Sequence, residues 1–558
     1  MEDGGRKRGF REGPRALLAW PGLPALIAAG VAVWLCWRLG EPITKDESHE
    51  WRMWIAGAGM GLLLLRLARP LLRGLPLGIA SRIWAAALAS LCVFGAFNYY
   101  NFDRREVEGI GDGTDIAYYY LNTKYLEELG YFRLYAALIV ADKEHRDRHA
   151  SRLRRYRDLR DYELKPVRVA HEHGAEIKEQ RFTAERWEEF KRDADHFLAF
   201  PQFRYLRNYF FVDHGYNPPP TWAVTGYLLA GAIPVEEVKW ATIADAALVT
   251  AALAAAAWAF GPEAALWVLL FLLTTFSGRW PMLGQTMLRF DWSSMLVIGV
   301  CLLKKERWLP AGAALSYAAF NRIFPAIFFF PWLVTALADW RRERHLPARH
   351  LRVTAGAAAT GVLLCAAALS LFGAEVIGES AKNLSMHNAS FSSHRVGLAD
   401  LMVWQGELTE EEIRATGGMH ARELAALATR DTRLLIGLLV MVWLGFHVAR
   451  VRPPLHEAIP LAAIPLFCFT TPQINYWNLR MILVLWHASH LDRGWFHRGG
   501  LAALLAVEVV THWSHVQGNA RFATTAISSW GLAVYFAAVL LWTAWQVARS
   551  FRREPAAS

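Results

Sequence analysis

Apolar residues in this chain gather in long, nearly uninterrupted windows instead of alternating with polar residues. In windows of about 19 residues these stretches recur from Leu17 onward, and many approach the length of about 20 residues that a helix needs to cross a bilayer core. The pattern predicts an all-α, polytopic transmembrane helical bundle of about 14 spans. The expected spans are 15–38, 52–68, 83–98, 239–260, 262–277, 290–303, 308–320, 323–338, 352–372, 433–450, 457–471, 477–491, 499–513 and 525–547.

Basic residues cluster at span ends that fall on one side under this threading. Short loops rich in Lys and Arg stay in the cytoplasm, so both termini are predicted to lie inside. We expect a multi-pass protein of a bacterial inner membrane whose long polar loops face the periplasm. The basic clusters are 6–8, 66–82, 304–307, 341–352, 450–452 and 549–553.

Composition agrees with a membrane protein, since 54% of the 558 residues are hydrophobic and 25 are Trp. The net charge of +10 also suits a nucleic-acid binder. However, the excess lies beside spans, where insertion topology and anionic membrane lipids explain it, so no nucleic-acid partner is expected. The cysteines fall in expected spans, which leaves no extracellular disulfide framework and no CxxC pair. They are Cys36, Cys92, Cys301, Cys365 and Cys468.

Long polar segments divide the chain into four parts. Residues 1–82 form an N-terminal, peripheral pair of spans, and residues 83–372 form a central module that includes an outer loop at 98–238. A second outer loop follows at 373–432, and helices at 433–558 complete the chain. A loop as long as the first outer loop usually does more in a compact protein than connect two elements.

The first outer loop carries two amphipathic patterns, 116–140 and 183–200, that predict helices able to lie along a membrane surface. In the second pattern Trp187, Phe190 and Phe197 recur at nearly helical spacing. Between the two patterns, residues 145–165 alternate Arg with Asp and Glu, which predicts a solvated helix rich in ion pairs.

Candidate chemistry begins directly after the third span. Asp112 and Asp115 flank a flexible Gly-Thr pair, and the aromatic run of Tyr118 and Tyr119 follows. A carboxylate at this depth can accept a proton from a hydroxyl if the two come within hydrogen-bond reach. Capping of the helix that follows is the competing interpretation, and from this fragment alone it is the stronger one.

Four arginines, Arg279, Arg289, Arg322 and Arg480, lie at outer ends of expected spans. An unpaired guanidinium beside apolar segments is costly, so such a group usually faces protein, water or an anion, and its planar fork suits phosphate oxygens. Pairing with Asp245 or Asp291 is an equally good explanation for any one of them. The second outer loop adds a run of donors, although any single histidine there is more often a surface residue. They are Asn383, His387, Asn388, Ser390, Ser392, Ser393, His394 and Arg395.

Several short motifs resemble the GT-C superfamily of integral membrane glycosyltransferases, most closely its polyprenyl-phosphate-mannose-dependent branch. The family's Asp, helix and Leu-Tyr pattern after the first catalytic span is similar to Asp115 to Tyr118, Gly130 and Leu134-Tyr135. Its aromatic and Pro-Pro element looks like 215–222. The family's Gly-Gln motif looks like Gly284-Gln285, and its basic turn looks like 304–307. Its Ala-Gly and Lys-x-x-Pro motifs look like Ala311-Gly312 and 322–325. Its polar donor-side loop looks like the loop before Gly397-Leu398.

The resemblance implies an inverting transferase that moves a sugar from a polyprenyl-phosphate carrier to a hydroxyl of a lipid, glycan or protein. The implied general base is Asp115, with Asp112 as its rival. The implied ligands of the donor phosphate are Arg322, Arg289, Arg480, His394 and Arg395. The implied substrate-binding residues are Tyr118, Tyr119, Tyr216, Asn217, Trp222, Gln285, His387 and Asn388. We expect no metal and no cofactor, because arginines can neutralise the phosphate and no metal-ligand spacing stands out.

The chain departs from the family pattern at three points: Arg322 stands where Lys is usual, two spans precede the module, and the first outer loop is longer. Two other functions stay open. A secondary transporter or lipid flippase also has many spans, and Asp245 and Glu508 lie within apolar windows as such proteins require. A noncatalytic scaffold that binds partners through the long loop is the third possibility.

Overall fold

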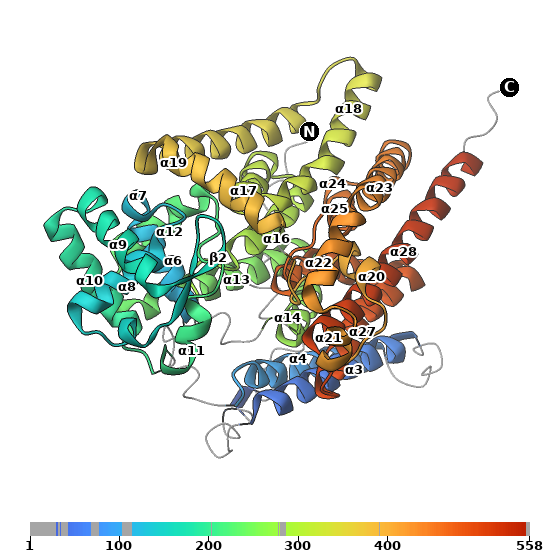
Figure 1. Ribbon diagram of the computed structural model, residues 1–558. Helices are drawn as coiled ribbons and strands as arrows, with labels where there is room; N and C mark the ends of the chain where they lie inside the picture. Colours follow the sequence, from blue (N-terminus) through green and yellow to red (C-terminus); the bar gives the residue numbers. More distant parts are fainter. Residues whose placement is uncertain are drawn as a thin grey trace.

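The computed structural model describes residues 30–31, 34, 43–67, 77–102, 114–201, 203–276, 278, 286–389 and 391–553. Within this part of the chain the expectation of an all-α architecture is confirmed, because helices follow one another throughout and the strands are confined to one hairpin. Figure 1 shows helices α6 to α12 gathered on one side, with α18 and α19 along one edge and α3 and α4 at another.

Among the residues that the structure describes, four helices are long and apolar enough to cross a membrane: α13 (Lys239–Phe260), α19 (Ala348–Ala389), α23 (Arg430–Val451) and α28 (Arg521–Arg553). These helices support a membrane protein, whereas the expected number of about 14 spans stays a prediction. Several expected spans are divided into pieces. The window at 457–471, for instance, consists of α24 (Leu455–Ala458), a 3₁₀ turn and α25 (Ala463–Phe469).

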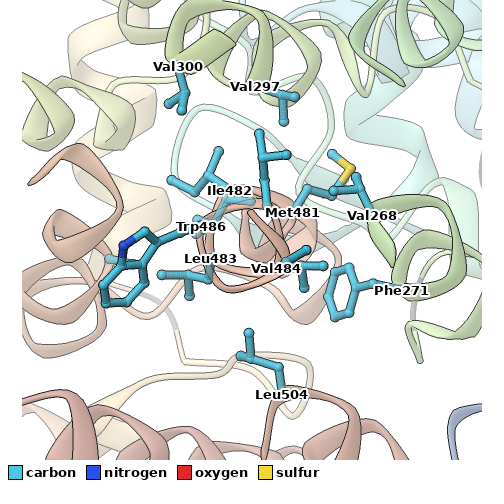
Figure 2. Packing of buried hydrophobic residues seen from close by; sticks show 14 of the residues in the cluster. Val268, Phe271, Val297, Val300, Met481, Ile482, Leu483, Val484, Trp486 and Leu504 are labelled. Carbon is cyan, nitrogen blue, oxygen red and sulfur yellow. The ribbon is translucent and has the colours of Figure 1, made fainter. Parts of the chain in front are cut away.

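The main core surrounds α26 (Met481–Ala488), a short helix whose residues are all buried. It packs between α14 (Pro262–Thr274), α16 (Asp291–Lys304) and α27 (Trp495–Val516). Such a helix is apolar on every side, because other helices cover it completely. Figure 2 shows this packing, in which the labelled side chains are Val268, Phe271, Val297, Val300, Met481, Ile482, Leu483, Val484, Trp486 and Leu504.

The N-terminal helices are part of the same bundle. Helix α3 (Lys45–Leu67) packs along α27, and α4 (Leu77–Tyr99) packs on α14. The Arg52 side chain of α3 is fully buried and donates a hydrogen bond to the carbonyl of Thr275 at 3.4 Å. A buried guanidinium bonded to another segment fixes the position of α3 against the bundle.

Helix α17 (Trp308–Asn321) packs closely on α16 and α19. A side chain at Gly312 or Gly356 would collide with backbone atoms of Val353 or Leu309, so glycine lets these two backbones approach. Helix α18 (Phe330–Glu343) precedes α19, which bends at Gly373, where φ is 75°. Glycine adopts this left-handed backbone at little cost.

The outer segment, residues 114–232, supplies most of a second core, which residues of 235–241, 287–288 and α19 complete. The expected helix at 183–200 is confirmed as α10 (Ala184–Leu198), whose first turn is capped by the Thr183 hydroxyl. Trp187, Phe190 and Phe197 are buried, so the apolar face of α10 packs against protein. The other helices of this segment are α6 (Thr114–Lys124), α7 (Leu126–Leu129), α8 (Leu134–His145), α9 (Val167–Arg181), α11 (Phe203–Phe210) and α12 (Pro220–Ala232).

The expectation of one charged helix at 145–165 is wrong. After α8 the chain forms an antiparallel hairpin of β1 (Arg155–Asp158) and β2 (Glu163–Pro166). Asp158 is 1% exposed and pairs with Arg160 at 2.6 Å and with Lys165 at 2.9 Å. In β1 burial alternates, with Tyr156 and Asp158 buried and Arg155 exposed, as the two-residue period of a strand requires.

Ion pairs join the outer segment to α19 beyond its bend. Arg133 contacts Glu379 at 2.7 Å and Glu375 at 3.2 Å, and Arg181 contacts Glu375 at 2.8 Å. Glu379 also accepts a hydrogen bond from the Tyr131 backbone at 2.8 Å. The C-terminal part of α19 is thus fastened to the outer segment. After it come α20 (Leu398–Val403), α21 (Glu410–Ala415) and α22 (Gly418–Ala428).

Candidate functional site

Two cavities meet where the outer segment, the end of α19 and the 470–476 loop come together. The polar cavity has a volume of about 480 Å³. It is lined by Lys45, His49, Asp115, Tyr118, Tyr119, Asp213, His214, Gly215, Tyr216, Asn217, Phe276, Arg289, His387, His394, Gln473, Ile474, Asn475, Tyr476, His515, Arg521 and Thr525. It draws residues from segments far apart in the sequence, as binding sites commonly do.

The second cavity, here called the arginine groove, has a volume of about 670 Å³. Arg322, Arg395, Arg430 and Arg433 line it together with Glu423 and a predominantly apolar wall. That wall includes Ile323, Phe324, Leu384, Phe391, Ala399, Ala426, Leu427, Leu434 and Phe469. Several guanidinium groups beside aliphatic and aromatic side chains suit a ligand with an anionic head and an apolar tail.

The polar cavity and the arginine groove adjoin, because four residues line both: Asn217, His387, Gln473 and Tyr476. A ligand can therefore extend from one into the other. Asn217 enters from the loop before α12, which the sequence motif at 215–222 had marked.

Backbone pairing holds the second outer loop against the 470–476 loop. Arg395 and Gln473 form an isolated antiparallel bridge, and the Ile474 backbone donates to the His394 carbonyl at 2.7 Å. A side chain at Gly397 would lie 2.7 Å from the Thr470 carbonyl oxygen, so this close approach requires glycine. The pairing places His394 at the polar cavity and Arg395 at the groove.

Asp115 and Arg289 form an ion pair in the polar cavity, with Nη1 2.8 Å from Oδ2. With its amide oriented to satisfy both groups, Asn475 accepts from Arg289 Nη2 at 2.9 Å and from Nε at 3.2 Å. Asp245 holds the backbone in place by accepting from the amides of Arg289 and Phe290, at 2.9 and 2.8 Å. The Asp115 side chain is 43% exposed, so its carboxylate is both oriented and accessible.

Asp213 is a second carboxylate of the polar cavity, which sequence reasoning missed. Its side chain is open to the cavity, yet the protein atoms around it raise its pKa, and the nearby Asp115 acts in the same direction. Next to it, burial lowers the pKa of His214 to about 4, so this imidazole is neutral near pH 7. In the sequence, its position just before the Gly215-Tyr216 motif could have marked Asp213 as a candidate site residue.

Arg322 is 5% exposed and lines the arginine groove. Its Nη1 donates to the neighbouring Asn321 carbonyl at 2.9 Å, but no described residue accepts from its Nε or Nη2. Its guanidinium lies 5.5 Å from the centre of the Trp222 ring and 5.9 Å from that of Tyr476. Buried donors without acceptors are costly, so these two nitrogens are capable of donating to a ligand in the groove.

Arg289 and Arg322 do not form the ion pairs with Asp245 or Asp291 that are the alternative explanation for these arginines. Among the described residues, neither carboxylate lies within ion-pair distance of the Arg289 or Arg322 guanidinium. Asp291 instead accepts from Tyr317 at 3.2 Å and from Asn321 at 3.1 Å. Asp291 still acts on the Arg322 charge through space, so this charge is only partly balanced where it lines the groove.

The expected aromatic residues cluster beside these charges. Tyr118, Tyr119 and Tyr216 line the polar cavity, whereas Trp222 is fully buried behind them and donates to the Leu288 carbonyl at 3.0 Å. The Tyr118 hydroxyl is engaged by the Phe210 carbonyl at 3.0 Å. Burial raises the pKa of Tyr119 to about 12, and Arg289 and Arg322 both act against this shift, so its hydroxyl is within electrostatic reach of both charges.

Arg480 must be reassigned from phosphate binding to structure. Its side chain is 1% exposed in the core, where Nη1 contacts Glu508 Oε1 at 2.5 Å and Nε donates to the Trp477 carbonyl at 2.9 Å. Glu508 also accepts from the Phe276 backbone at 2.7 Å. Both charges of this pair are therefore satisfied internally. Asp112, Gln285, Arg279 and the side chain of Asn388 lie outside the described residues.

No group of three His, Cys, Asp or Glu side chains is placed to hold a metal ion within the described part of the chain. Comparisons with protein-family models, with curated proteins and with solved structures found no match. The likeness to the GT-C superfamily therefore stays a hypothesis that rests on the sequence motifs.

Proposed function

We propose that the protein is an inverting GT-C-type glycosyltransferase that transfers a sugar from a polyprenyl-phosphate carrier to an acceptor hydroxyl on the non-cytoplasmic side of a bacterial inner membrane. One observation carries the proposal: a carboxylate cavity adjoins a groove that combines arginines with an apolar wall. The donor then has a place for its phosphate and lipid, and the acceptor has a place beside a base.

In this reaction Asp115 is the general base. The acceptor oxygen attacks the anomeric carbon from the face opposite the phosphate, and its proton passes to the Asp115 carboxylate as the carbon–oxygen bond to the phosphate breaks. Attack from the opposite face inverts the anomeric configuration. Arg289 and Asn475 orient the base, because they fix one carboxylate oxygen and leave the other for the acceptor. Asp213 is the second carboxylate that can take this proton.

Arg322 stabilises the charge that develops on the departing polyprenyl phosphate. Two of its nitrogens have no acceptor among the described residues, and a preorganised donor of this kind needs no rearrangement as charge builds up. Arg395 and Arg433 line the same groove and add positive potential. The apolar wall then receives the first units of the lipid chain, while the rest extends into the membrane.

The transporter or flippase alternative is less well supported by the two acidic residues on which it depends. Glu508 is held in an ion pair with Arg480, and Asp245 accepts two backbone amides. Groups with such fixed partners are poorly suited to exchange ions or substrates during transport.

The test is a transfer assay in which purified protein in proteoliposomes is mixed with radiolabelled polyprenyl-phosphate sugars and candidate lipid, glycan and peptide acceptors. Wild-type protein should form product of inverted configuration, whereas Asp115→Asn and Arg322→Ala should form little. Arg168→Gln is the matched control, because Arg168 is an exposed arginine of α9 in the outer segment. Equal transfer by wild type and all three variants would refute the proposed site.

A further inference from the structure

Helices α18 and α19 form a hairpin whose turn lies apart from both cavities. Figure 1 shows this turn at the upper edge of the molecule, and none of residues 333–352 lines the polar cavity or the arginine groove. From Ala348 to its bend at Gly373, α19 rises about 1.5 Å per residue, or about 38 Å in all. A bilayer core is about 30 Å thick, so an α19 that crosses the membrane places its turn and its bend at opposite faces.

Exposed arginines crowd this turn, and the acidic residues of the hairpin are engaged with other partners. Asp339 contacts Arg349 at 2.6 Å, and Glu343 contacts His345 at 3.7 Å. No carboxylate of the described residues lies within ion-pair distance of the four remaining arginines, here called the turn arginines. They are Arg341, Arg342, Arg344 and Arg352.

The backbone that carries the turn arginines is fixed. Asp339 Oδ2 contacts Arg349 Nη2 at 2.6 Å and His350 Nε2 at 2.8 Å, which ties the end of α18 to the start of α19. His350 is fully buried, so this contact is shielded from water. Arg344 ends α18 with a left-handed backbone, φ 59°, and its amide donates to the Trp340 carbonyl at 2.8 Å.

An exposed apolar stripe leads to the turn arginines. Leu333, Leu337 and Trp340 follow one another at spacings of four and three residues, which places them on one face of α18, and all three are exposed. Leu351, in the first turn of α19, is exposed as well. Arg344 follows Trp340 by about one helical turn. Apolar side chains that end in a tryptophan beside arginines are typical of the boundary between acyl chains and headgroups.

We propose that the turn arginines and the apolar stripe bind an anionic phospholipid of the leaflet at this face, with its phosphate at the arginines and its acyl chains along the stripe. The guanidinium fork suits phosphate oxygens, and basic clusters beside spans attract anionic lipids. Insertion topology accounts for the charges alone and bulk lipid for the stripe alone, whereas one bound anionic lipid accounts for both. The inference does not depend on the proposed function, because neither cavity takes part.

Native mass spectrometry of the purified full-length chain in detergent tests this site by counting bound lipids. Titrations with cardiolipin, phosphatidylglycerol and phosphatidylcholine compare headgroups of decreasing negative charge. Wild-type protein should prefer the two anionic lipids, and added salt should reduce the preference because exposed charges are screened. The combined variant Arg341→Gln, Arg342→Gln and Arg344→Gln should bind the anionic lipids about tenfold more weakly or worse, and phosphatidylcholine about as before.

Matched variants separate this site from a general effect of charge. The same three positions changed to lysine should keep binding within about threefold, because the charge is retained. Arg154→Gln, Arg155→Gln and Arg168→Gln together remove as many exposed arginines from the outer segment and should leave lipid binding unchanged. Arg344→Gln alone should weaken binding about fivefold, which keeps the test valid if the triple glutamine variant does not fold.

Four outcomes would overturn the inference. Anionic and neutral lipids bind wild type alike, the glutamine variants bind like wild type, or the outer-segment variant loses as much binding as the triple glutamine variant. In the fourth, wild-type protein is a dimer and the triple glutamine variant a monomer, which would identify the surface as a contact between two copies of the chain.

Discussion

Arg289 reaches Asp115 across 174 positions of sequence and holds its carboxylate at 2.8 Å. Asn475 fixes the other side of the same guanidinium, so three separate segments determine where the carboxylate points. Asp115 lies in the first turn of α6, where its charge favours the helix dipole, and the ion pair adds a second constraint on its carboxylate.

Asp115→Asn should lower kcat for sugar transfer by about 10²–10⁴-fold, the usual contribution of a general base, with a much smaller change in KM. Arg289→Lys should cause a milder loss, because a lysine keeps the charge but cannot contact Asp115 and Asn475 together. Steady-state kinetics in proteoliposomes measure both. A rise in KM alone for Asp115→Asn would instead indicate a binding residue.

The contribution of Arg322 to sugar transfer should depend on its positive charge more than on the shape of its side chain. Arg322→Gln should reduce kcat by about 10²–10³-fold, as expected for the loss of a donor to developing charge. Arg322→Lys should retain a substantial part of the activity, because the resemblance places lysine at this position. If lysine and glutamine variants lose activity equally, phosphate stabilisation by a positive charge is not the role of this residue.

The Arg480–Glu508 pair should contribute to stability. Replacing either residue alone leaves a buried charge without its partner, which costs about 3–5 kcal/mol. Glu508→Gln should therefore lower the melting temperature in detergent, and the double replacement Arg480→Met with Glu508→Leu should recover part of the loss. Unchanged thermal stability of Glu508→Gln would show that the pair is not structural.

Stability should decrease as the pH falls from about 6.5 to about 4. The pKa values of His214 and His394 are both lowered to about 4, chiefly by burial, whereas an unfolded histidine titrates near 6.5. In that window the unfolded chain binds protons that the folded chain does not, so acid favours unfolding, and the effect levels off below about pH 4. Melting temperatures across this range should fall less steeply for His214→Gln. Equal slopes would contradict the assignment.

Hydropathy and periodicity predicted the all-α class and helix α10, because both depend on local order, whereas the number of spans stays a prediction. The spacing of Trp187, Phe190 and Phe197 located α10 almost to its ends. Charge alternation at 145–165 was misread, because the same letters suit a salt-bridged helix and a strand whose inward face carries a neutralised Asp158. Helices divided into short pieces, such as α24 and α25, also look like one span when only apolar content is counted.

The candidate site was predicted only where motifs marked it. Short motifs mark Asp115, Tyr216 and Arg322, and the structure brings these residues to two adjoining cavities. The partners of Arg480 and the position of Asp213 depend on how distant segments meet, and sequence spacing carries no information about that. In the sequence, Arg480 and Arg322 are both arginines at the ends of expected spans, and this position does not distinguish their roles. Only the presence of Glu508 beside Arg480 separates a structural ion pair from a charge left available to a ligand.

The far end of α19 makes two sets of contacts. Glu375 and Glu379 hold the outer segment, while Ser380 and Leu384, within about one turn, line the arginine groove. An α-helix is stiff over so short a distance, so the residues of α19 that hold the outer segment and those that line the groove keep a fixed relation to one another beyond the bend at Gly373. The outer segment and the arginine groove therefore share one rigid support.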